Sequence, residues 1–347
     1  MTTFIDLFAG IGGIRIAFES AGAECVFSSE YDRFAQLTYE RYFKEKPDFK
    51  SIKEVYPPGD ITKLDAAEIP DHDILTGGFP CQPFSLAGVS KKNSLNKPHG
   101  FDDPTQGTLF FNIKEIIREK NPKAFLLENV KNLVRHDKGL TFEVISDELD
   151  NLDYIWDKRI IDASGWIPQH RERTYIVGFR KNLFPDAQKE EVLNFFYDIK
   201  PPENRLYNLS DVLEENVPEK YTLMEKTWDT LLRHKAHHAA AGNGFGYSVI
   251  EPPFENKITR TISARYHKDG AEILIYQGEN KRPRRLTPLE CSRLMGFPED
   301  FQKNFSRDSK ITQPVSDTQA YRQFGNSVAV PVVKEIASGI VNKLENS

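Results

Sequence analysis

Two residues of this chain could carry out covalent and acid–base chemistry on a ligand. Cys81 lies in the segment GGFPCQP, just after the apolar residues Ile74 and Leu75, and a thiolate at such a turn is a strong nucleophile. Glu128 directly follows the apolar segment 125–127, where burial would raise its pKa and suit it to donate a proton. If both segments are parallel strands, both side chains emerge at one edge of the sheet. Taken alone, each residue could also be structural, as a buried cysteine or a helix-capping glutamate.

Two arginines precede another apolar segment. Arg171 and Arg173 lie in the three residues immediately before residues 174–179, which are predicted to form a strand. If that strand is antiparallel to the others, its beginning lies at the same edge as Cys81 and Glu128, and an arginine reaches the site. An exposed, charged strand entry is the alternative.

A glycine turn near the N-terminus predicts a nucleoside site. Gly10 and Gly12 in the segment DLFAGIGG permit a tight turn and close approach of the backbone to a ligand. Glu30 follows the next predicted strand, about where an acidic residue binds ribose hydroxyls. Arg15 stands at the third glycine position of G-x-G-x-x-G, which disfavours a pyrophosphate and favours an adenosine-type cofactor without phosphates. Asp60 could accept a hydrogen bond from an exocyclic amino group or cap a turn, and a glycine turn used only for packing stays possible.

The elements that must position these residues alternate along the N-terminal half. Apolar segments predict strands at 4–8, 25–28, 73–75, 124–127, 156–161 and 174–179, and helical spacing predicts helices at 14–19, 109–120 and 332–344. This order is typical of an α/β fold with a mostly parallel sheet covered by helices. Residues 201–285 lack that rhythm and are rich in polar, aromatic and glycine residues, which predicts a smaller, irregular second domain.

Composition further limits the classes of protein to which this chain could belong. The 347 residues are 39% hydrophobic and 28% charged with a net charge of -5, which permits a large core and argues only mildly against nucleic acid as a partner. Three cysteines cannot form a disulfide framework and point to a reducing, cytoplasmic setting. We expect no signal peptide, no membrane-spanning segment and no metal site.

Beyond these separate signals, ordered blocks across nearly the whole chain resemble the bacterial cytosine-C5 DNA methyltransferases. The blocks are DLFAGIGG (6–13), Glu30, GDI (59–61), GGFPCQPFS (77–85), GTLF (107–110), ENV (128–130), QHRER (169–173), RRLTPLEC (284–291) with MGFP (295–298), and QFGNSV (323–328). The resemblance implies a Rossmann-like S-adenosylmethionine-dependent methyltransferase fold with a mixed sheet. It divides the chain into a catalytic and cofactor-binding domain (1–200), a target-recognition domain (201–285) and a C-terminal segment (286–347) that returns to the first.

The same resemblance implies the reaction and its residues. The enzyme would be a DNA (cytosine-5-)-methyltransferase in which Cys81 attacks C6 of a flipped cytosine, Glu128 protonates N3, Arg173 holds O2 and Arg171 supports it. S-adenosylmethionine would be the methyl donor. Its pocket would be formed by Phe8 on the adenine face, Glu30 on the ribose and Asp60 on the adenine amino group, with Gly10, Gly12, Tyr31, Ile61, Pro80, Leu109 and Asn326 around them.

The resemblance also implies partners. A mobile loop over about 85–101 would close on the extruded base, and lysines 91, 92 and 97 could meet phosphates. Residues 239–247 and 259–270 are similar to the recognition regions of enzymes that modify C-C-W-G-G, C-C-N-G-G or C-C-G-G sites. Double-stranded DNA is therefore the expected substrate. We expect a monomer that serves a restriction–modification system beside a cognate endonuclease.

Three other functions fit part of this pattern. A tRNA cytosine-C5 methyltransferase on the same scaffold is the nearest, but the long variable region favours duplex DNA. A nicotinamide-dependent dehydrogenase fits the glycine turn and Glu30 but not Arg15 or the pairing of Cys81 with Glu128. A catalytically silent DNA-binding relative would not need Cys81, Glu128 and Arg173.

Overall fold

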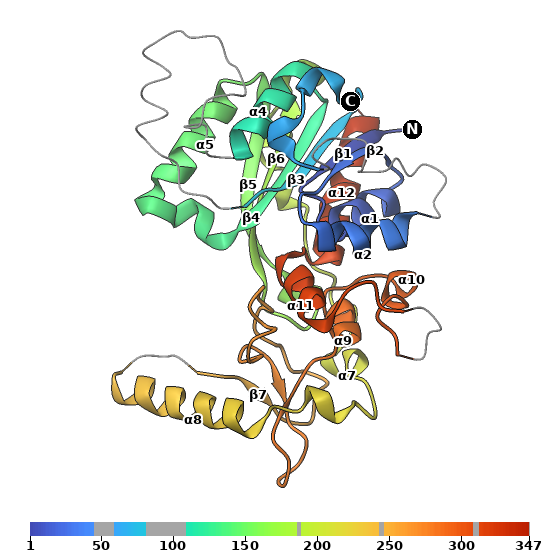
Figure 1. The fold of residues 1–347 in the computed structure, drawn as a ribbon. Coiled ribbons are helices and arrows are strands. Elements are labelled where there is room, and N and C mark those ends of the chain that lie inside the picture. The colour runs from blue at the N-terminus through green and yellow to red at the C-terminus, as the bar shows by residue number, and fades with distance from the viewer. Residues whose placement is uncertain (45–58, 81–108, 186–188, 243–245, 308–311, 347) are drawn as a thin grey trace.

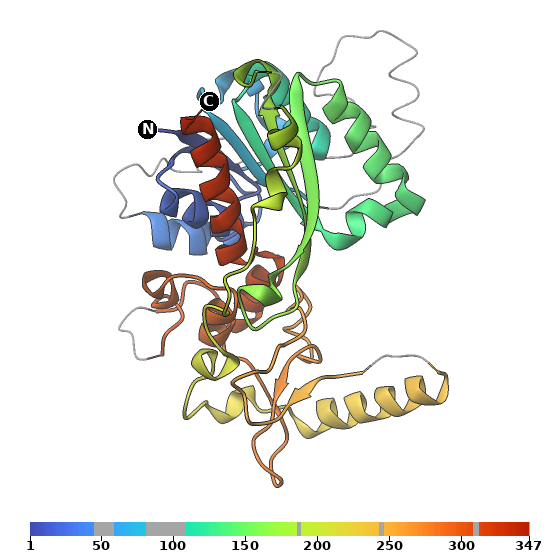
Figure 2. The ribbon, with the colours of Figure 1, turned by 180° about the vertical axis from the view of Figure 1, so that it is seen from behind.

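The structure is a computed structural model that describes residues 1–44, 59–80, 109–185, 189–242, 246–307 and 312–346. Figure 1 shows a lobe built on a sheet, with both chain ends at its far side, and a second lobe that carries a projecting helix. Figure 2 shows the same two lobes from behind.

One sheet forms the centre of the first lobe. Its strands run in the order β2-β1-β3-β4-β6-β5. Their bounds are β1 Thr3–Leu7, β2 Glu24–Ser29, β3 Ile74–Gly78, β4 Ala124–Val130, β5 Tyr154–Asp162 and β6 Glu172–Arg180. The first four strands pair in parallel, and β6 is antiparallel to both β4 and β5. The sheet is therefore mixed, and β6 begins at the edge where β3 and β4 end.

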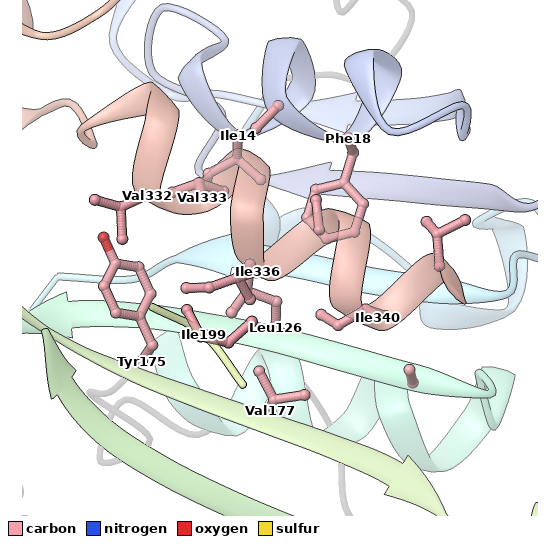
Figure 3. Close-up of a cluster of buried hydrophobic side chains, with 14 of the residues drawn as sticks. Ile14, Phe18, Leu126, Tyr175, Val177, Ile199, Val332, Val333, Ile336 and Ile340 are labelled. Atoms are coloured by element: carbon pink, nitrogen blue, oxygen red, sulfur yellow. The ribbon is translucent and has the colours of Figure 1, made fainter. Parts of the chain in front are cut away.

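Alternation along each strand divides the core between the two faces of the sheet. In β1, Phe4 packs on one face and Ile5 on the other. The first face is covered by α1 (Gly13–Ser20) and α12 (Val330–Glu345), where Phe18, Val333 and Ile336 are buried against the sheet (Figure 3). The opposite face is covered by α4 (Leu109–Lys120) and α5 (Leu140–Asp150).

The remaining helices and strands lie in both lobes and in the connections between them. The α-helices are α2 Arg33–Phe43, α6 Lys189–Leu193, α7 Leu209–Val212, α8 Glu225–Ala240, α9 Pro288–Leu294, α10 Glu299–Gln302 and α11 Asp317–Asn326. The 3-10 segments are η2 Ile61–Lys63, η3 Ala66–Glu68, η4 Lys131–Gly139, η5 Ala163–Gly165, η6 Lys181–Leu183, η8 Phe195–Tyr197 and η9 Glu219–Tyr221. A small sheet joins β7 Val249–Ile250, β8 Leu274–Ile275 and β9 Arg284–Arg285.

The predicted fold class is confirmed, with helices α2, α5 and α8 among the elements missed. The strands and helices expected in the N-terminal half are all present, with bounds shifted by a few residues at most. Within 201–285, predicted to be irregular, α8 is a helix of 16 residues of which only Leu231 is buried. Its apolar periodicity is weak because solvent surrounds it, so spacing could not predict it. The boundaries at 200/201 and 285/286 stay predictions.

No helix in the described parts of the chain combines the length and apolar character needed to cross a bilayer.

Candidate active site

A cavity of about 640 Å³ lies at the carboxyl edge of the parallel strands. Its walls come from the turn after β1, the residues after β2, the ends of β3 and β4, the start of β6, and helices α4 and α11. Nine of the predicted site residues line it: Phe8, Gly10, Glu30, Tyr31, Pro80, Leu109, Glu128, Arg173 and Asn326. The sheet and helix α11 therefore bring together residues that are more than 300 positions apart.

The glycine turn and Glu30 form one end of this cavity. The Gly10 backbone N–H donates to Glu30 Oε2 at 2.7 Å, and the Asp32 N–H donates to Oε1 at 2.7 Å. Burial raises the pKa of Glu30, and these two backbone donors oppose that shift. Each carboxylate oxygen keeps a second lone pair, so Glu30 can still accept a hydroxyl donor from a ligand.

Arg15 explains why the turn has no third glycine. Its side chain is 3% exposed and lies beneath the turn, with Nε 2.6 Å from Glu19 Oε1 and its guanidinium 4.1 Å from the centre of the Phe43 ring. One of its terminal nitrogens also donates to the Tyr39 hydroxyl at 3.1 Å. Arg15 therefore packs α1 onto α2, and it is not among the residues that line the cavity.

Glu128 and Arg173 form the other end of the cavity. Glu128 lies opposite Gly78 in the β3–β4 register, and Arg173 lies opposite Val130 in the β4–β6 register. Arg173 Nε is 3.1 Å from Glu128 Oε1, and both side chains are close to nine-tenths buried. Burial raises the pKa of Glu128, against the opposing effect of the two neighbouring arginines. A carboxyl with a raised pKa is better suited to general acid catalysis.

The end of β4 also fixes the segment that leads to Cys81. The Asn129 side-chain amide donates to the Phe79 carbonyl at 2.8 Å, and both residues line the cavity with Pro80. Cys81 itself lies outside the described residues, as does the predicted loop 85–101. Pro80, the residue before Cys81, nevertheless lies in the same cavity wall as Glu128.

Arg171 lies behind the wall of the cavity, and its predicted role in supporting Arg173 stays a prediction. It is 1% exposed and does not line the cavity. Its guanidinium donates to the carbonyls of Ile262 at 3.0 Å and Gly325 at 2.9 Å, and also to that of Ser327. Arg171 therefore ties the start of β6 to the segment after residue 259 and to the end of α11, where Asn326 faces the cavity.

Three predicted cofactor residues do not line the cavity: Gly12, Asp60 and Ile61. Gly12 forms the predicted turn with φ +85°, and a Cβ there would lie 2.3 Å from the Phe43 ring. The Asp60 carboxylate caps η2 by accepting from the Thr62 N–H at 3.0 Å and hydroxyl at 2.7 Å. Its assignment to an adenine amino group stays a prediction, although the preceding residue, Gly59, lies against the Glu30 backbone.

One face of α11 was missed as part of the site. Gln319, Arg322 and Gln323 line the cavity on the same side of the helix as Asn326. Their spacing of seven, four and three residues from Asn326 is the helical signal that could have identified them. Gln323 also connects the site to α2, because its side-chain amide donates to the Phe34 carbonyl at 2.8 Å.

The cavity fits an adenosine-type cofactor with an amino-acid end. Its volume lies within the range of pockets that hold small molecules. Phe8 offers a ring face, Glu30 offers hydroxyl acceptors, and the Gly10 turn admits close backbone approach. The described residues contain no group of histidine, cysteine or carboxylate side chains that could hold a metal ion.

Comparisons with known proteins agree with this geometry. The profile of the C-5 cytosine-specific DNA methylase family matches residues 2–342. A DNA-cytosine methyltransferase of Escherichia coli K12 is 46% identical over 99% of this chain and 78% of its own length. Type II methyltransferase M.SsoII of Shigella sonnei is 49% identical over 99% of this chain and 80% of its own length. The crystal structure of Schizosaccharomyces pombe Dnmt2 methyltransferase shares the fold, with a TM-score of 0.70 at 20% identity over 99% of this chain and 100% of that one. The chain therefore belongs to the C-5 cytosine-specific DNA methylase family and is a DNA cytosine-C5 methyltransferase that uses S-adenosylmethionine as its methyl donor.

Proposed function

We propose that this enzyme methylates a flipped cytosine through a covalent adduct with Cys81, and that it is the modification enzyme of a restriction–modification system. The observation that carries the proposal is the pairing of Glu128 with Arg173 at the strand edge from which the chain leads to Cys81. Asn129 supports it, because its bond to the Phe79 carbonyl holds that segment against the end of β4.

The proposed chemistry follows from the fact that a neutral pyrimidine is a poor electrophile. The Cys81 thiolate forms a bond to C6 of cytosine while Glu128 gives its proton to N3, so that negative charge does not accumulate on the ring. Arg173 donates to O2 and holds the base in the plane of Glu128. The resulting enamine is nucleophilic at C5, which would form a bond to the methyl group while the bond from that methyl to the sulfonium sulfur breaks and S-adenosylhomocysteine is left. Loss of the C5 proton to a base, cleavage of the sulfur–C6 bond and return of the N3 proton to the Glu128 carboxylate then release neutral 5-methylcytosine and the thiolate.

The cofactor supplies an electrophilic methyl group on a sulfonium. We assign its adenosine part to the end of the cavity formed by Phe8, Gly10, Glu30 and Tyr31. The amino-acid part would extend toward Asn326 on α11, and Pro80 and Leu109 would enclose the transferred group beside Glu128. This order would leave the Glu128 end open to the everted base.

The finer assignments belong to the same proposal. Type II methyltransferases M.SsoII of Shigella sonnei and M1.ScrFI of Lactococcus lactis subsp. cremoris are 49% and 47% identical to this chain. We assign recognition of a C-C-W-G-G, C-C-N-G-G or C-C-G-G type of site to residues 201–285, because segments 239–247 and 259–270 are similar in sequence to the recognition regions of such enzymes. A monomer in the cytoplasm, with a cognate endonuclease acting on the same site, completes the proposal.

Bisulfite sequencing of DNA incubated with the enzyme and S-adenosylmethionine tests both the reaction and the target. A converted pattern with one short protected sequence supports the proposal and identifies the methylated cytosine. Methylated tRNA beside unmethylated DNA would instead favour the tRNA methyltransferase.

Substitution Cys81→Ala tests the nucleophile. The variant should bind S-adenosylmethionine like the wild type but transfer no methyl group, because no thiolate can add to C6. Trapping on duplexes that contain 5-fluorocytosine at the target gives a second readout, since only the wild type should form a denaturation-resistant adduct. Normal turnover by the variant would refute the assignment.

A further inference from the structure

A second cavity of about 340 Å³ adjoins the active site on the side of η4. It shares Val130 and Arg173 with the cofactor cavity, so these two residues separate the two spaces. Thr261 from the second lobe contributes to its wall, and its hydroxyl donates to the His170 carbonyl. This cavity therefore lies where the two lobes meet, directly beside the predicted position of the target base.

The charge of this cavity is positive although the chain is acidic overall. Its charged lining residues are Lys131, Arg135, Arg173 and Glu172. Lys131 Nζ is 2.7 Å from both carboxylate oxygens of Glu172, and Arg173 is paired with Glu128. Arg135 is exposed, and no residue in the described parts of the chain forms an ion pair or hydrogen bond with it. One arginine thus remains available to an anionic ligand.

Apolar side chains stand beside that arginine. Val130 is 41% exposed and Ile160 is 40% exposed, and both line the cavity. Isolated exposed apolar residues are ordinary, but two of them next to an unpaired arginine match a ligand with a carbon ring and an anionic group. A deoxyribose joined to a phosphate has this chemistry.

The backbone holds Arg135 in place. Leu133 anchors η4 with 1% exposure. The turn after Arg135 contains two non-glycine residues in the left-handed region, Asp137 at φ 48° and Lys138 at φ 57°. Such conformations are unfavourable and persist only where the surrounding structure imposes them. In both Figure 1 and Figure 2, this segment between β4 and α5 lies on the same side of the molecule as α8.

We propose that the second cavity binds a phosphodiester attached to the everted target nucleotide, with Arg135 as the phosphate contact and Val130 and Ile160 against the sugar. The inference rests on the proposed function, since it requires a flipped cytosine at Glu128. Arg135 is then a positioning residue: it holds the strand at the mouth of the active site and takes no part in methyl transfer itself.

The test combines an arginine variant with a neutral phosphate. Duplexes carry the target found by bisulfite sequencing, and one phosphodiester on either side of the target cytosine is replaced by a methylphosphonate. At 0.1 M salt the wild type should lose roughly eightfold in affinity at one of these positions, from a salt dependence of about 0.9 per phosphate contact. Arg135→Gln should show the same loss on the unmodified duplex and no further loss on the modified one. Its plot of log affinity against log salt should be shallower by about 1.

Two variants provide controls. Arg135→Lys keeps the charge and should recover most of the affinity. Arg41→Gln removes an exposed arginine on α2, on the opposite side of the first lobe from η4 (Figure 1), and should behave like the wild type. S-adenosylmethionine affinity should be unchanged in each variant, which shows that the fold is intact.

Two results would overturn the inference. One is an Arg135→Gln enzyme that binds the unmodified duplex like the wild type. The other is a methylphosphonate penalty in the variant equal to that of the wild type at both positions. Failure of the proposed function is seen separately, as absence of methyl transfer to duplex DNA by the wild type, and it would remove this inference as well.

Discussion

Substitution Glu128→Gln isolates the proton that this carboxyl is proposed to deliver. Glutamine has nearly the same shape, and its amide oxygen can still accept from Arg173 Nε, which lies 3.1 Å from Glu128 Oε1. Gly78 leaves the space above the carboxyl free, since a Cβ there would be 3.3 Å from Oε2. The substitution therefore leaves the cavity intact and removes only the transferable proton.

The expected loss follows from the role of a general acid. Proton transfer by a positioned side chain contributes about 10²- to 10⁴-fold to a rate, or roughly 3 to 5 kcal/mol of activation free energy. We expect the single-turnover rate of methyl transfer to fall by that factor, with S-adenosylmethionine affinity unchanged. Glu143→Gln, the same change on the exposed face of α5, is the matched control.

The pH dependence gives an independent check with a defined sign. Burial raises the pKa of Glu128, and the proposed acid must be protonated, so the wild-type rate should fall as pH rises through that pKa. The rate of the variant should not show this fall with pH.

Stability should respond in a related way. The pKa of Glu128 is higher in the folded state than in the unfolded state, so Glu128 contributes most to the unfolding free energy below its unfolded-state pKa. That contribution is lost as pH rises through the folded-state pKa. The variant lacks that contribution, so it should be no less stable than the wild type at alkaline pH. A variant rate within threefold of the wild type would refute the acid role. A variant that unfolds more easily in urea at pH 8 would refute the account of its burial.

Three further predictions concern the frame of the site. Burial raises the pKa of Asp6 from 3.8 to about 7, so the wild type should lose up to about 4 kcal/mol of unfolding free energy between pH 4 and pH 7. The unfolding free energy of Asp6→Asn, measured by urea titration, should lack that pH dependence, and an unchanged pH dependence would contradict the burial argument. Gly59→Ala should weaken S-adenosylmethionine binding at least tenfold in calorimetry, because a Cβ there would lie 1.7 Å from the Glu30 carbonyl oxygen. Gly22→Ala, with φ +88° and no atom within 4 Å of the added Cβ, should cost only about 1–2 kcal/mol of stability and leave binding intact, so equal binding losses would exclude the steric explanation. Arg171→Met should lower the unfolding free energy by about 3 kcal/mol, since it leaves buried carbonyls without a donor. A loss below 1 kcal/mol would show that those contacts contribute little to stability.

The sequence by itself determined the parts of the site that depend on local order. Strand periodicity, a glycine turn and a polar residue after each apolar segment are readable because they follow from side-chain alternation and backbone sterics. They predicted the sheet and the positions of Glu30 and Glu128 at its edge. The predicted approach of Arg173 also held, because it depended only on one strand being antiparallel.

Tertiary structure decided which of these residues face the cavity. Arg173 is the second residue of β6 and Arg171 immediately precedes that strand. Local alternation would point both side chains to the same face, yet Arg173 reaches Glu128 while Arg171 reaches the carbonyls of Ile262 and Gly325. Those partners lie 91 and 154 positions away in sequence, and no local pattern predicts packing at such a separation. The face of α11 and the free arginine beside the active site likewise became visible only when the two lobes were brought together, because burial and pairing are properties of packed surfaces and not of sequence order.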